Sequence, residues 1–450
     1  MTQSSLSKKI LSRNSENLCR AIYRKTGMPI KRAYDVYLED VEGSRYLDFS
    51  AGGTTAVGYS HPKVIEAVIE QAKTSLDMAD LAIGIVDLRN ELAEEIKSLV
   101  PSKLAQGKIA FGHSGSDIVE KAIRVARFAT SRPMIISCFE AHHGASPGAL
   151  SASPTLKEMG STTIARFFQL PGFLYMPFPD SYRPWFGVGS DAGKASLAFL
   201  ERLLASVVSP ELVAGIIVEP ILSYGGNIVP PDGYFQGLAE ICHRNGIPLI
   251  SDEVLTGIGK TGRMFALEHW NVWPDVLCLG KALSGSVPLS LLLAEDDLAA
   301  KWRPEDEVGM SKGGHLIGCA MALAILRIVR EEKLVQHAEK MGHYMIRRIQ
   351  DLKEDLEIPG QVRGLGLLVG FDLVENEATK KPASQLASRV VELARQNGLI
   401  FGIVGAGHNV LRFTPSLTIR EEHIDTAAET IEQVFKDLRA QGLVQKAVSH

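Results

Sequence analysis

Long apolar runs are missing from this sequence of 450 residues. No uninterrupted apolar stretch reaches the roughly 20 residues that a membrane-spanning helix needs. The first residues, MTQSSLSKKILSRNSENLCR, are polar and contain no apolar core of the kind found in a secretory signal. We therefore expect a cytoplasmic protein without a membrane partner.

Cysteine is scarce, and its spacing excludes two kinds of site. None of the five cysteines forms a C-x-x-C pair, so the sequence predicts neither a zinc site nor a disulfide framework, and we expect no metal. Thiols that stay reduced and buried are typical of cytosolic proteins. The cysteines are Cys19, Cys138, Cys242, Cys278 and Cys319.

The sequence also has no excess of positive charge. Its net charge is −4, and no basic cluster with interleaved aromatic residues occurs, so we expect no nucleic-acid partner. What is present is the composition of a globular protein with a large core, with 45% hydrophobic and 22% charged residues.

Two short apolar runs organise the middle of the chain. They cover Gly246–Ser251 and Val276–Gly280, and they are followed by Asp252 and Lys281, respectively. An amphipathic helix over about Gly233–Arg244 precedes the first run. Helices that alternate with short apolar strands predict a parallel sheet covered on both faces. Because ligands bind at the carboxyl ends of such strands, we expect Asp252 and Lys281 to face one crevice.

A carboxylate and an amine at neighbouring strand ends suit pyridoxal 5'-phosphate (PLP). This cofactor needs a lysine for its Schiff base and a carboxylate for its pyridine nitrogen. For an isolated Asp and Lys, two solvated loop charges would be the ordinary interpretation. The residues around this pair favour the cofactor instead.

The stretch resembles the signature of the class III aminotransferases, a family of the PLP fold type I superfamily. The family pattern runs from a strand through Asp-Glu-Val/Ala, T-G-x-G-(K/R)-T-G-x-M-F-A and Pro-Asp to a second strand and the lysine. This sequence supplies Asp252-Glu253-Val254, then TGIGKTGRMFA from Thr256 to Ala266, Pro274-Asp275 and Lys281. The resemblance covers about residues 35–438.

The resemblance implies an α/β fold of PLP fold type I. We expect a large PLP-binding domain over residues 61–325, with a mostly parallel seven-stranded sheet between helices. Residues 1–60 and 326–450 are expected to form a smaller α+β domain. One long helical segment is expected over 316–352. The C-terminal part of the smaller domain is expected to hold strands over 362–373 and 399–413 and a helix over 421–439.

Gly115 and Ser116 open a helix that follows the strand candidate Lys108–Phe111. Free N–H groups and the positive end of the helix dipole suit a phosphate there. The matching pair in the family holds the PLP phosphate, although Ser116 alone would be read as a plain helix cap.

The family resemblance implies the other cofactor contacts. Lys281 carries the Schiff base and acts as general base, and Asp252 keeps the ring nitrogen protonated. His142 takes the position of the aromatic residue that stacks on the ring, with Val254 on the opposite face, while the neighbouring His143 is expected to be structural. Glu219 is expected to contact the cofactor.

Ser311 is expected to reach the phosphate of the neighbouring subunit, where the family carries a threonine. This role implies a homodimer or a dimer of dimers with shared active sites.

Arg412 matches the family's arginine that grips a substrate carboxylate, although a buried arginine on a strand is often a structural ion-pair partner. Gly53 and Tyr224 are expected on the substrate side. Gly53 stands where dialkylglycine decarboxylase carries a glutamine. Tyr224 stands where racemases of this branch carry a second base and where ω-aminotransferases carry a glutamate that pairs with the arginine.

We therefore predict a PLP-dependent aminotransferase acting on an α-amino acid, with a keto acid as acceptor. A phenol holds its proton more tightly than a carboxylic acid and is a poor second base. Racemisation or epimerisation stays open, because Phe111–Asp117 and Pro177–Pro184 resemble the racemase branch. A decarboxylating transaminase and a PLP-fold protein without catalysis are the remaining alternatives.

Overall fold

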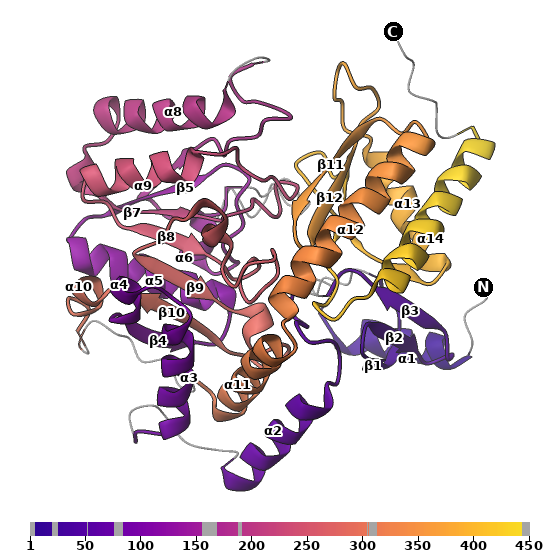
Figure 1. Ribbon diagram of the computed structural model, residues 1–450, viewed down its shortest axis with the longest axis horizontal. Coiled ribbons are helices and arrows are strands. Elements are labelled where there is room, and N and C mark those ends of the chain that lie inside the picture. The colour runs from indigo at the N-terminus through magenta and orange to yellow at the C-terminus, as the bar shows by residue number, and fades with distance from the viewer. Residues whose placement is uncertain are drawn as a thin grey trace.

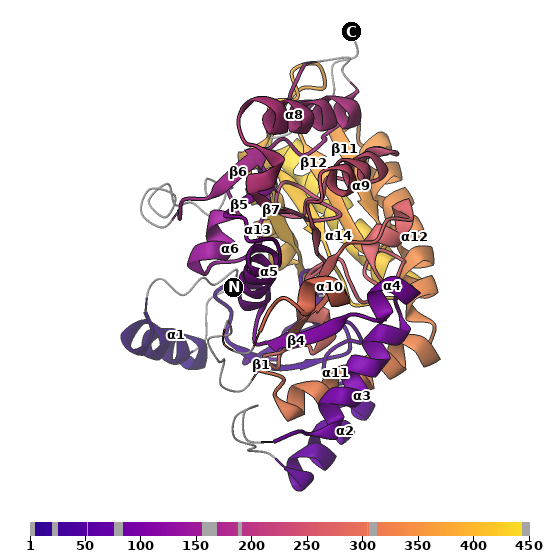
Figure 2. The same ribbon diagram turned by 90° about the vertical axis from the view of Figure 1, so that its left-hand side faces the viewer.

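The computed structural model describes residues 5–19, 26–51, 53–75, 84–154, 169–187, 191–303, 305 and 313–442. Figure 1 shows two parts side by side, one built around a large sheet and one formed by the first strands and the C-terminal third of the chain. Figure 2 gives the same arrangement from the side.

The large sheet has seven strands in the order β4-β10-β9-β8-β7-β5-β6. Only β10 runs antiparallel to its neighbours, so the sheet is mostly parallel, as the fold prediction required. The strands are β4 (Lys108–Gly112), β5 (Met134–Cys138), β6 (Phe173–Met176), β7 (Val213–Val218), β8 (Leu249–Asp252), β9 (Val276–Leu279) and β10 (Ser290–Ala294).

Helices cover both faces of this sheet. Helix α5 (Gly115–Thr130) packs its apolar side on one face, and α8 (Ala192–Ser206) and α9 (Tyr234–Arg244) cover the other. Because every residue of β7, β8, β9 and β10 is buried, these strands are apolar runs rather than alternating ones. Shorter helices of this part are α3 (Asp87–Ser98), α4 (Ser102–Ala105), α6 (Pro147–Ser151) and α10 (Asp296–Ala299), with the 3-10 turns η1 (Pro210–Leu212), η2 (Ala266–Trp270) and η3 (Lys281–Leu283).

The second part joins the two ends of the described chain. Strand β13 (Leu399–Ile400) pairs parallel with β3 (Arg45–Asp48), which extends the N-terminal sheet of β1 (Ile30–Tyr34), β2 (Tyr37–Asp40) and β3. A second sheet has the order β11-β12-β15-β14. Its strands are β11 (Gly360–Leu365), β12 (Leu368–Leu373), β14 (Gly402–Val404) and β15 (Val410–Phe413). The helices described in this part are α1 (Ser5–Asn17), α12 (Leu334–Asp355), α13 (Ser384–Gln396) and α14 (Glu421–Ala440).

Three elements expected as continuous are broken by turns. The segment 316–352 is two helices, α11 (Leu316–Glu331) and α12 (Leu334–Asp355), separated at Lys333, whose φ is +53°. The segment 362–373 belongs to the β11-β12 hairpin, which turns at Gly366 with φ +52°. The segment 399–413 holds β13, β14 and β15. Apolar patterning alone does not mark these backbone reversals, because the turns leave neighbouring apolar residues in the core.

Buried polar groups join the two parts. Asp372 on β12 is fully buried, and its carboxylate binds the guanidinium of Arg183, which follows β6 in the large part, with Nη2 donating at 2.7 Å. Arg363 on β11 lies 3.0 Å from the same carboxylate, and the Asn409 amide donates to it at 2.7 Å. Elsewhere at the junction, the buried amine of Lys260 donates to the Pro415 carbonyl at 2.7 Å.

We predict that Asp372→Ala destabilises the fold by about 3–5 kcal/mol, because it removes the counter-ion of the Arg363 guanidinium, which is 9% exposed, and of Arg183, which is 30% exposed. Glu201→Ala is the matched control. Glu201 pairs with Arg244 at 2.7 Å, but both side chains are 54% exposed, and removal of such a pair costs about 1 kcal/mol or less. Denaturant unfolding followed by circular dichroism measures both. Equal losses in the two variants would contradict the assigned role of Asp372.

Candidate active site

The carboxyl ends of β7, β8 and β9 meet at one edge of the large sheet. A cavity of about 160 Å3 opens there. Seven of the eight residues predicted to bind the cofactor line it, and the eighth, Ser311, lies outside the described residues. The lining residues are Gly115, Ser116, His142, His143, Gly144, Glu219, Asp252, Val254, Leu255 and Lys281.

Lys281 enters this cavity through a strained backbone. It is separated from the end of β9 by Gly280 and opens the turn η3 with φ +42°, a conformation that costs about 1–3 kcal/mol for a residue other than glycine. Burial lowers the pKa of the Lys281 amine, and the nearby Asp252 carboxylate partly opposes that shift. A lowered pKa increases the fraction of neutral amine, the form that acts as nucleophile and base.

Asp252, the last residue of β8, is held by two groups. Its Oδ2 lies 2.7 Å from Nδ1 of the buried His143, and its Oδ1 accepts a hydrogen bond from the Val254 backbone at 3.1 Å. The backbone N–H of His143 donates to Ser153 Oγ at 2.7 Å, which anchors the ring. Sequence analysis gave His143 no role in the site. Its place after His142, just past the end of β5, was the only signal of this contact.

Glu219 and His142 form the next layer of the cavity wall. Glu219 Oε1 accepts from the His142 backbone at 2.9 Å, and Oε2 accepts from Ser223 Oγ at 2.6 Å. Burial raises the pKa of Glu219. Burial and the neighbouring Lys281 lower the pKa of His142 to about 4, so its ring is neutral at pH 7. That ring lies 4.3 Å from the ring of Tyr224, tilted by 41°.

The N-terminus of α5 points into the same cavity. Ser114 caps the helix by accepting from Asp117 N at 3.3 Å, so Ser116 is not the cap residue that the plain alternative assumed. Ser116 Oγ instead accepts from Ala145 N at 2.9 Å. The first N–H groups of a helix have no acceptor within the helix and favour an anion.

Two glycines beside this helix end allow close packing, because they lack a side chain. A Cβ at Gly115 would lie 2.9 Å from a methyl of Val254, and a Cβ at Gly144 would lie 2.6 Å from Ser116 Oγ. A side chain at either position would therefore clash with residues that line the cavity. An amine, a carboxylate with a buried partner, a flat imidazole and an anion-binding helix end fit the groups of PLP.

Arg412 lies on β15, on the face of the small sheet that meets the large part. It is 9% exposed, and its guanidinium lies 5.2 Å from the centre of the Tyr224 ring. No residue of the described ranges forms a hydrogen bond or ion pair with Arg412, and its Nη1 is buried without a partner. The alternative of a structural ion pair therefore finds no counter-ion in the part of the chain that the structure describes.

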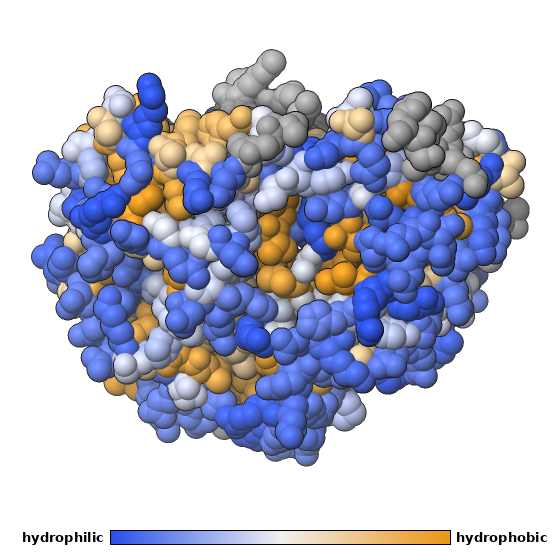
Figure 3. Space-filling view, turned by 45° about the horizontal axis from the view of Figure 1, so that its top comes forward, coloured by the Kyte–Doolittle hydropathy of each residue, from blue (hydrophilic) through white to orange (hydrophobic). Residues whose placement is uncertain are grey.

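The remaining substrate-side residue is Gly53. A Cβ there would lie 2.8 Å from Leu255 Cδ1, so Gly53 packs against the cavity wall. Near the site, a pocket of about 280 Å3 lies where the two parts meet, between Glu140, Phe178 and Leu222 on one side and residues that include Val410 on the other. In the view of Figure 3, apolar side chains line a hollow near the middle of the molecule.

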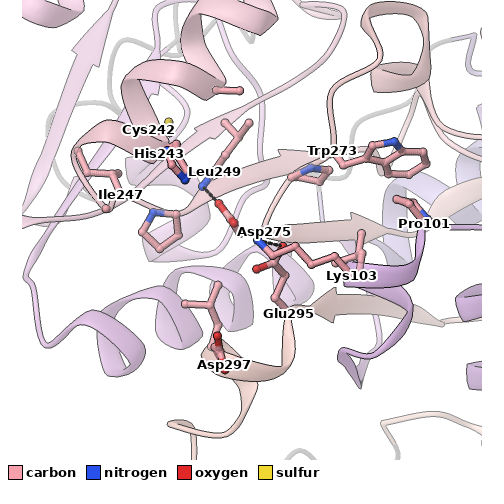
Figure 4. Close-up of a pocket in the computed structure, with 16 residues that line it drawn as sticks. Pro101, Lys103, Cys242, His243, Ile247, Leu249, Trp273, Asp275, Glu295 and Asp297 are labelled. Atoms are coloured by element: carbon pink, nitrogen blue, oxygen red, sulfur yellow. Dashed lines mark hydrogen bonds and ion pairs between the residues drawn. The ribbon is translucent and has the colours of Figure 1, made fainter.

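A different cavity of about 420 Å3 lies at the opposite, amino-terminal ends of β8 and β9 (Figure 4). Two of its three carboxylates have partners. Asp275 accepts from the Leu249 backbone at 2.7 Å, and Glu295 pairs with Lys103 at 2.7 Å. Lys281, with its strained backbone, lies at the other edge of the large sheet, and Arg412 belongs to the small sheet.

Neither a metal site nor a membrane span is found among the described residues. They contain no group of three or more His, Cys, Asp or Glu side chains placed to hold a metal ion. None of the helices described is both long enough and apolar enough to span a bilayer.

The sequence profile of the class III aminotransferases matches residues 20–435. The chain is 32% identical to the alanine/serine racemase of Pyrococcus horikoshii, over 93% of this chain and 88% of that protein. It is 31% identical to the diaminobutyrate–2-oxoglutarate aminotransferase of Haemophilus influenzae, over 94% and 93%.

Among solved structures, an amine transaminase from an uncultivated Pseudomonas species in its PLP-bound form superposes with a TM-score of 0.86. It is 28% identical, and the match covers 94% of this chain and 98% of that one. With the site geometry above, these matches show that the chain belongs to the class III aminotransferase family of PLP-dependent enzymes.

Proposed function

We propose that this enzyme transfers the amino group of an α-amino acid to a keto acid. The choice of a substrate with a carboxylate rests on one observation: Arg412 is a buried cation without a counter-ion among the described residues. Buried charges are normally paired, because desolvation of an isolated ion is costly. A substrate carboxylate supplies the missing partner through a bidentate pair.

The cofactor would be held by residues of the large sheet and its helices. The helix end at Gly115 and Ser116 would take the phosphate, Asp252 would pair with the ring nitrogen, and His142 and Val254 would contact the ring. Bound PLP supplies an electron sink for negative charge that develops at the substrate Cα.

The protein's own groups then divide the work. The Lys281 amine takes the proton from the substrate Cα as general base and then donates it as general acid. His143 Nδ1, 2.7 Å from the Asp252 carboxylate, holds that carboxylate in position at the end of β8. Arg412 fixes the carboxylate and thereby orients the Cα–H bond toward Lys281.

Transamination is favoured over racemisation by the surroundings of Tyr224. Its ring is packed between His142 and the Arg412 guanidinium, and it cannot form the ion pair by which a glutamate would withdraw that arginine. A racemase needs a second base across from Lys281. Racemisation remains the second candidate, since a racemase is among the relatives at 32% identity.

The proposed assembly is at least a homodimer. Helix α2 (Pro62–Thr74) projects from the body in both ribbon views (Figures 1 and 2) and carries Ile65 and Ile69, which are 46% and 47% exposed. A pocket of about 320 Å3 runs from these residues to the loop Thr54–His61 on the substrate side. We propose that a second copy covers this apolar surface. Ser311, which lies outside the described residues, keeps the role that the family resemblance implies, a contact with the phosphate of the neighbouring subunit.

The expected domain limits and location are also kept as proposals. Residues 61–325 would form the large domain, and residues 1–60 with 326–450 the small one. Four of the five cysteines are buried and all are free, which is compatible with a reducing cytoplasm.

The purified protein should be yellow, and borohydride should bleach it and fix the cofactor on Lys281. Peptide mass spectrometry locates the adduct. Lys281→Ala should still bind PLP, but without the covalent link. An adduct on another lysine would refute the assignment.

Arg412→Ala should reduce kcat/KM for a good amino acid by a factor equivalent to about 2–5 kcal/mol, and far less for a simple amine, because only the amino acid loses a charge partner. Steady-state assays with both donors measure this difference. A uniform loss would mean that Arg412 does not bind the carboxylate.

Tyr224→Phe should leave transamination largely intact, because the ring stacking is retained. Chiral chromatography with keto-acid detection tests the choice of reaction. Many turnovers to the enantiomer without keto acid, abolished in Tyr224→Phe, would make the enzyme a racemase with Tyr224 as its second base.

Replacing Ile65 and Ile69 together by Asp should convert the dimer to monomers and remove most activity, because charges would have to be buried in the subunit contact. Val207→Asp is the control, since Val207 is 68% exposed at the end of α8, far from this surface. Light scattering after size exclusion gives the mass. A fully active monomer of the unmodified protein would overturn the assembly proposal.

A further inference from the structure

Asn227 is a buried polar residue to which sequence analysis assigned no role. It lies in the turn that follows β7, where Leu222 and Ile228 form an isolated bridge, and its φ is +53°. The side chain is fully buried, and neither its amide nitrogen nor its amide oxygen has a hydrogen-bond partner among the described residues. Burial of an unsatisfied amide costs free energy, so this residue type at this position needs an explanation.

The register of the small sheet shows what lies next to Asn227. Arg363 on β11 pairs with Gly370 on β12, and Gly370 pairs with Arg412 on β15. Directly opposite residues of antiparallel strands project to the same face. A Cβ at Gly370 would lie 3.3 Å from Asn227 Cβ and 3.3 Å from the Gly226 carbonyl. Asn227 therefore occupies the gap between the two arginines that Gly370 leaves open.

The two arginines differ in what they already bind. Arg363 donates to the Gly226 carbonyl at 2.9 Å, to Gln361 at 2.9 Å, and pairs with Asp372 at 3.0 Å. The Arg412 guanidinium lies 5.2 Å from the centre of the Tyr224 ring, and its Nη1 is buried without a hydrogen-bond partner in the described ranges. An amide oxygen is an acceptor, and a guanidinium has five N–H donors. The unused donor of Arg412 and the unused acceptor of Asn227, which packs over Gly370, thus lie on the same side of the small sheet.

We propose that Asn227 is a positioning residue for Arg412: its amide oxygen accepts from the guanidinium through one buried water and holds the other N–H groups toward the substrate carboxylate. Tyr224 packs on the guanidinium face and Asn227 supports its edge. The inference rests on the proposed function, because it takes Arg412 as the carboxylate contact. It makes Asn227 a determinant of selectivity for carboxylated amino donors over simple amines.

The test compares two glycine variants of the PLP-loaded enzyme. Asn227→Gly removes the amide and keeps the left-handed backbone favourable. Asn271→Gly is the matched control, because Asn271 also has a positive φ, +51°, but is an exposed cap of η2. For Asn227→Gly we expect KM for an amino acid to rise about tenfold with kcat little changed, equivalent to about 1.4 kcal/mol. Turnover of a simple amine should be unchanged, and Asn271→Gly should alter neither substrate.

Binding gives a readout that is independent of turnover. Calorimetric titration with propionate, a carboxylate without an amine, should show a weakened Kd in Asn227→Gly and an unchanged Kd in Asn271→Gly. Asn227→Asp should weaken propionate binding further, because a buried carboxylate would compete for Arg412. Equal losses for the amino acid and the simple amine, or an unchanged propionate Kd, would overturn the proposal.

A double-mutant cycle separates this inference from the proposed function. If Asn227 acts through Arg412, then Asn227→Gly should have no further effect on KM in an Arg412→Ala background. An additive effect would show that Asn227 acts elsewhere and would refute the inference. If Arg412→Ala itself does not discriminate amino acid from amine, the proposed function fails, whatever the Asn227 variants do.

Discussion

The parallel pairing of β7, β8 and β9 is the constraint on which the site depends. Their carboxyl ends meet at one edge of the sheet, and each strand is followed by, or ends in, an ionisable residue: Glu219, Asp252 and Lys281. The strands are completely buried, so their register cannot slip without moving apolar side chains out of two cores. The reactive groups are therefore placed by the core rather than by their own interactions.

Concentrating these charges in a buried place has a cost that the surroundings offset. Asp252 contacts His143 and a backbone N–H, and Glu219 binds Ser223 and the His142 backbone. Lys281 adds backbone strain, which the packing of the adjacent β9 sustains. Arg412 is the exception, since no described residue neutralises it. A buried cation without a counter-ion lowers the stability of the fold, and a bound carboxylate would offset that loss.

The junction between the two parts carries the substrate side of the site. Arg412 belongs to the small sheet, whereas Tyr224 and Asn227 belong to a turn of the large part. Their mutual position depends on contacts such as the Asp372 cluster and the Lys260–Pro415 hydrogen bond. A change at this junction would alter selectivity without touching Lys281.

Local sequence was sufficient for the chemistry at the centre of the site. The apolar runs before Asp252 and Lys281, and the Gly-Ser turn before an amphipathic helix, predicted a parallel sheet with a cofactor at its edge, because strand and helix periodicity are local properties. The long motif around Asp252 predicted the family for the same reason. Backbone reversals at Lys333 and Gly366 were missed, since apolar patterning continues across them.

Only the tertiary structure decided which polar groups meet. Two contacts join segments more than 100 residues apart: that of His143 with Asp252 and that of Asn227 with Gly370. The lack of a counter-ion at Arg412 is also visible only in the folded chain. No local pattern encodes such pairs, because each residue type taken alone is equally compatible with a solvated loop or a structural ion pair. The sequence by itself determined the family, the cofactor and the strand ends, while packing of the two sheets determined the environment of each charge.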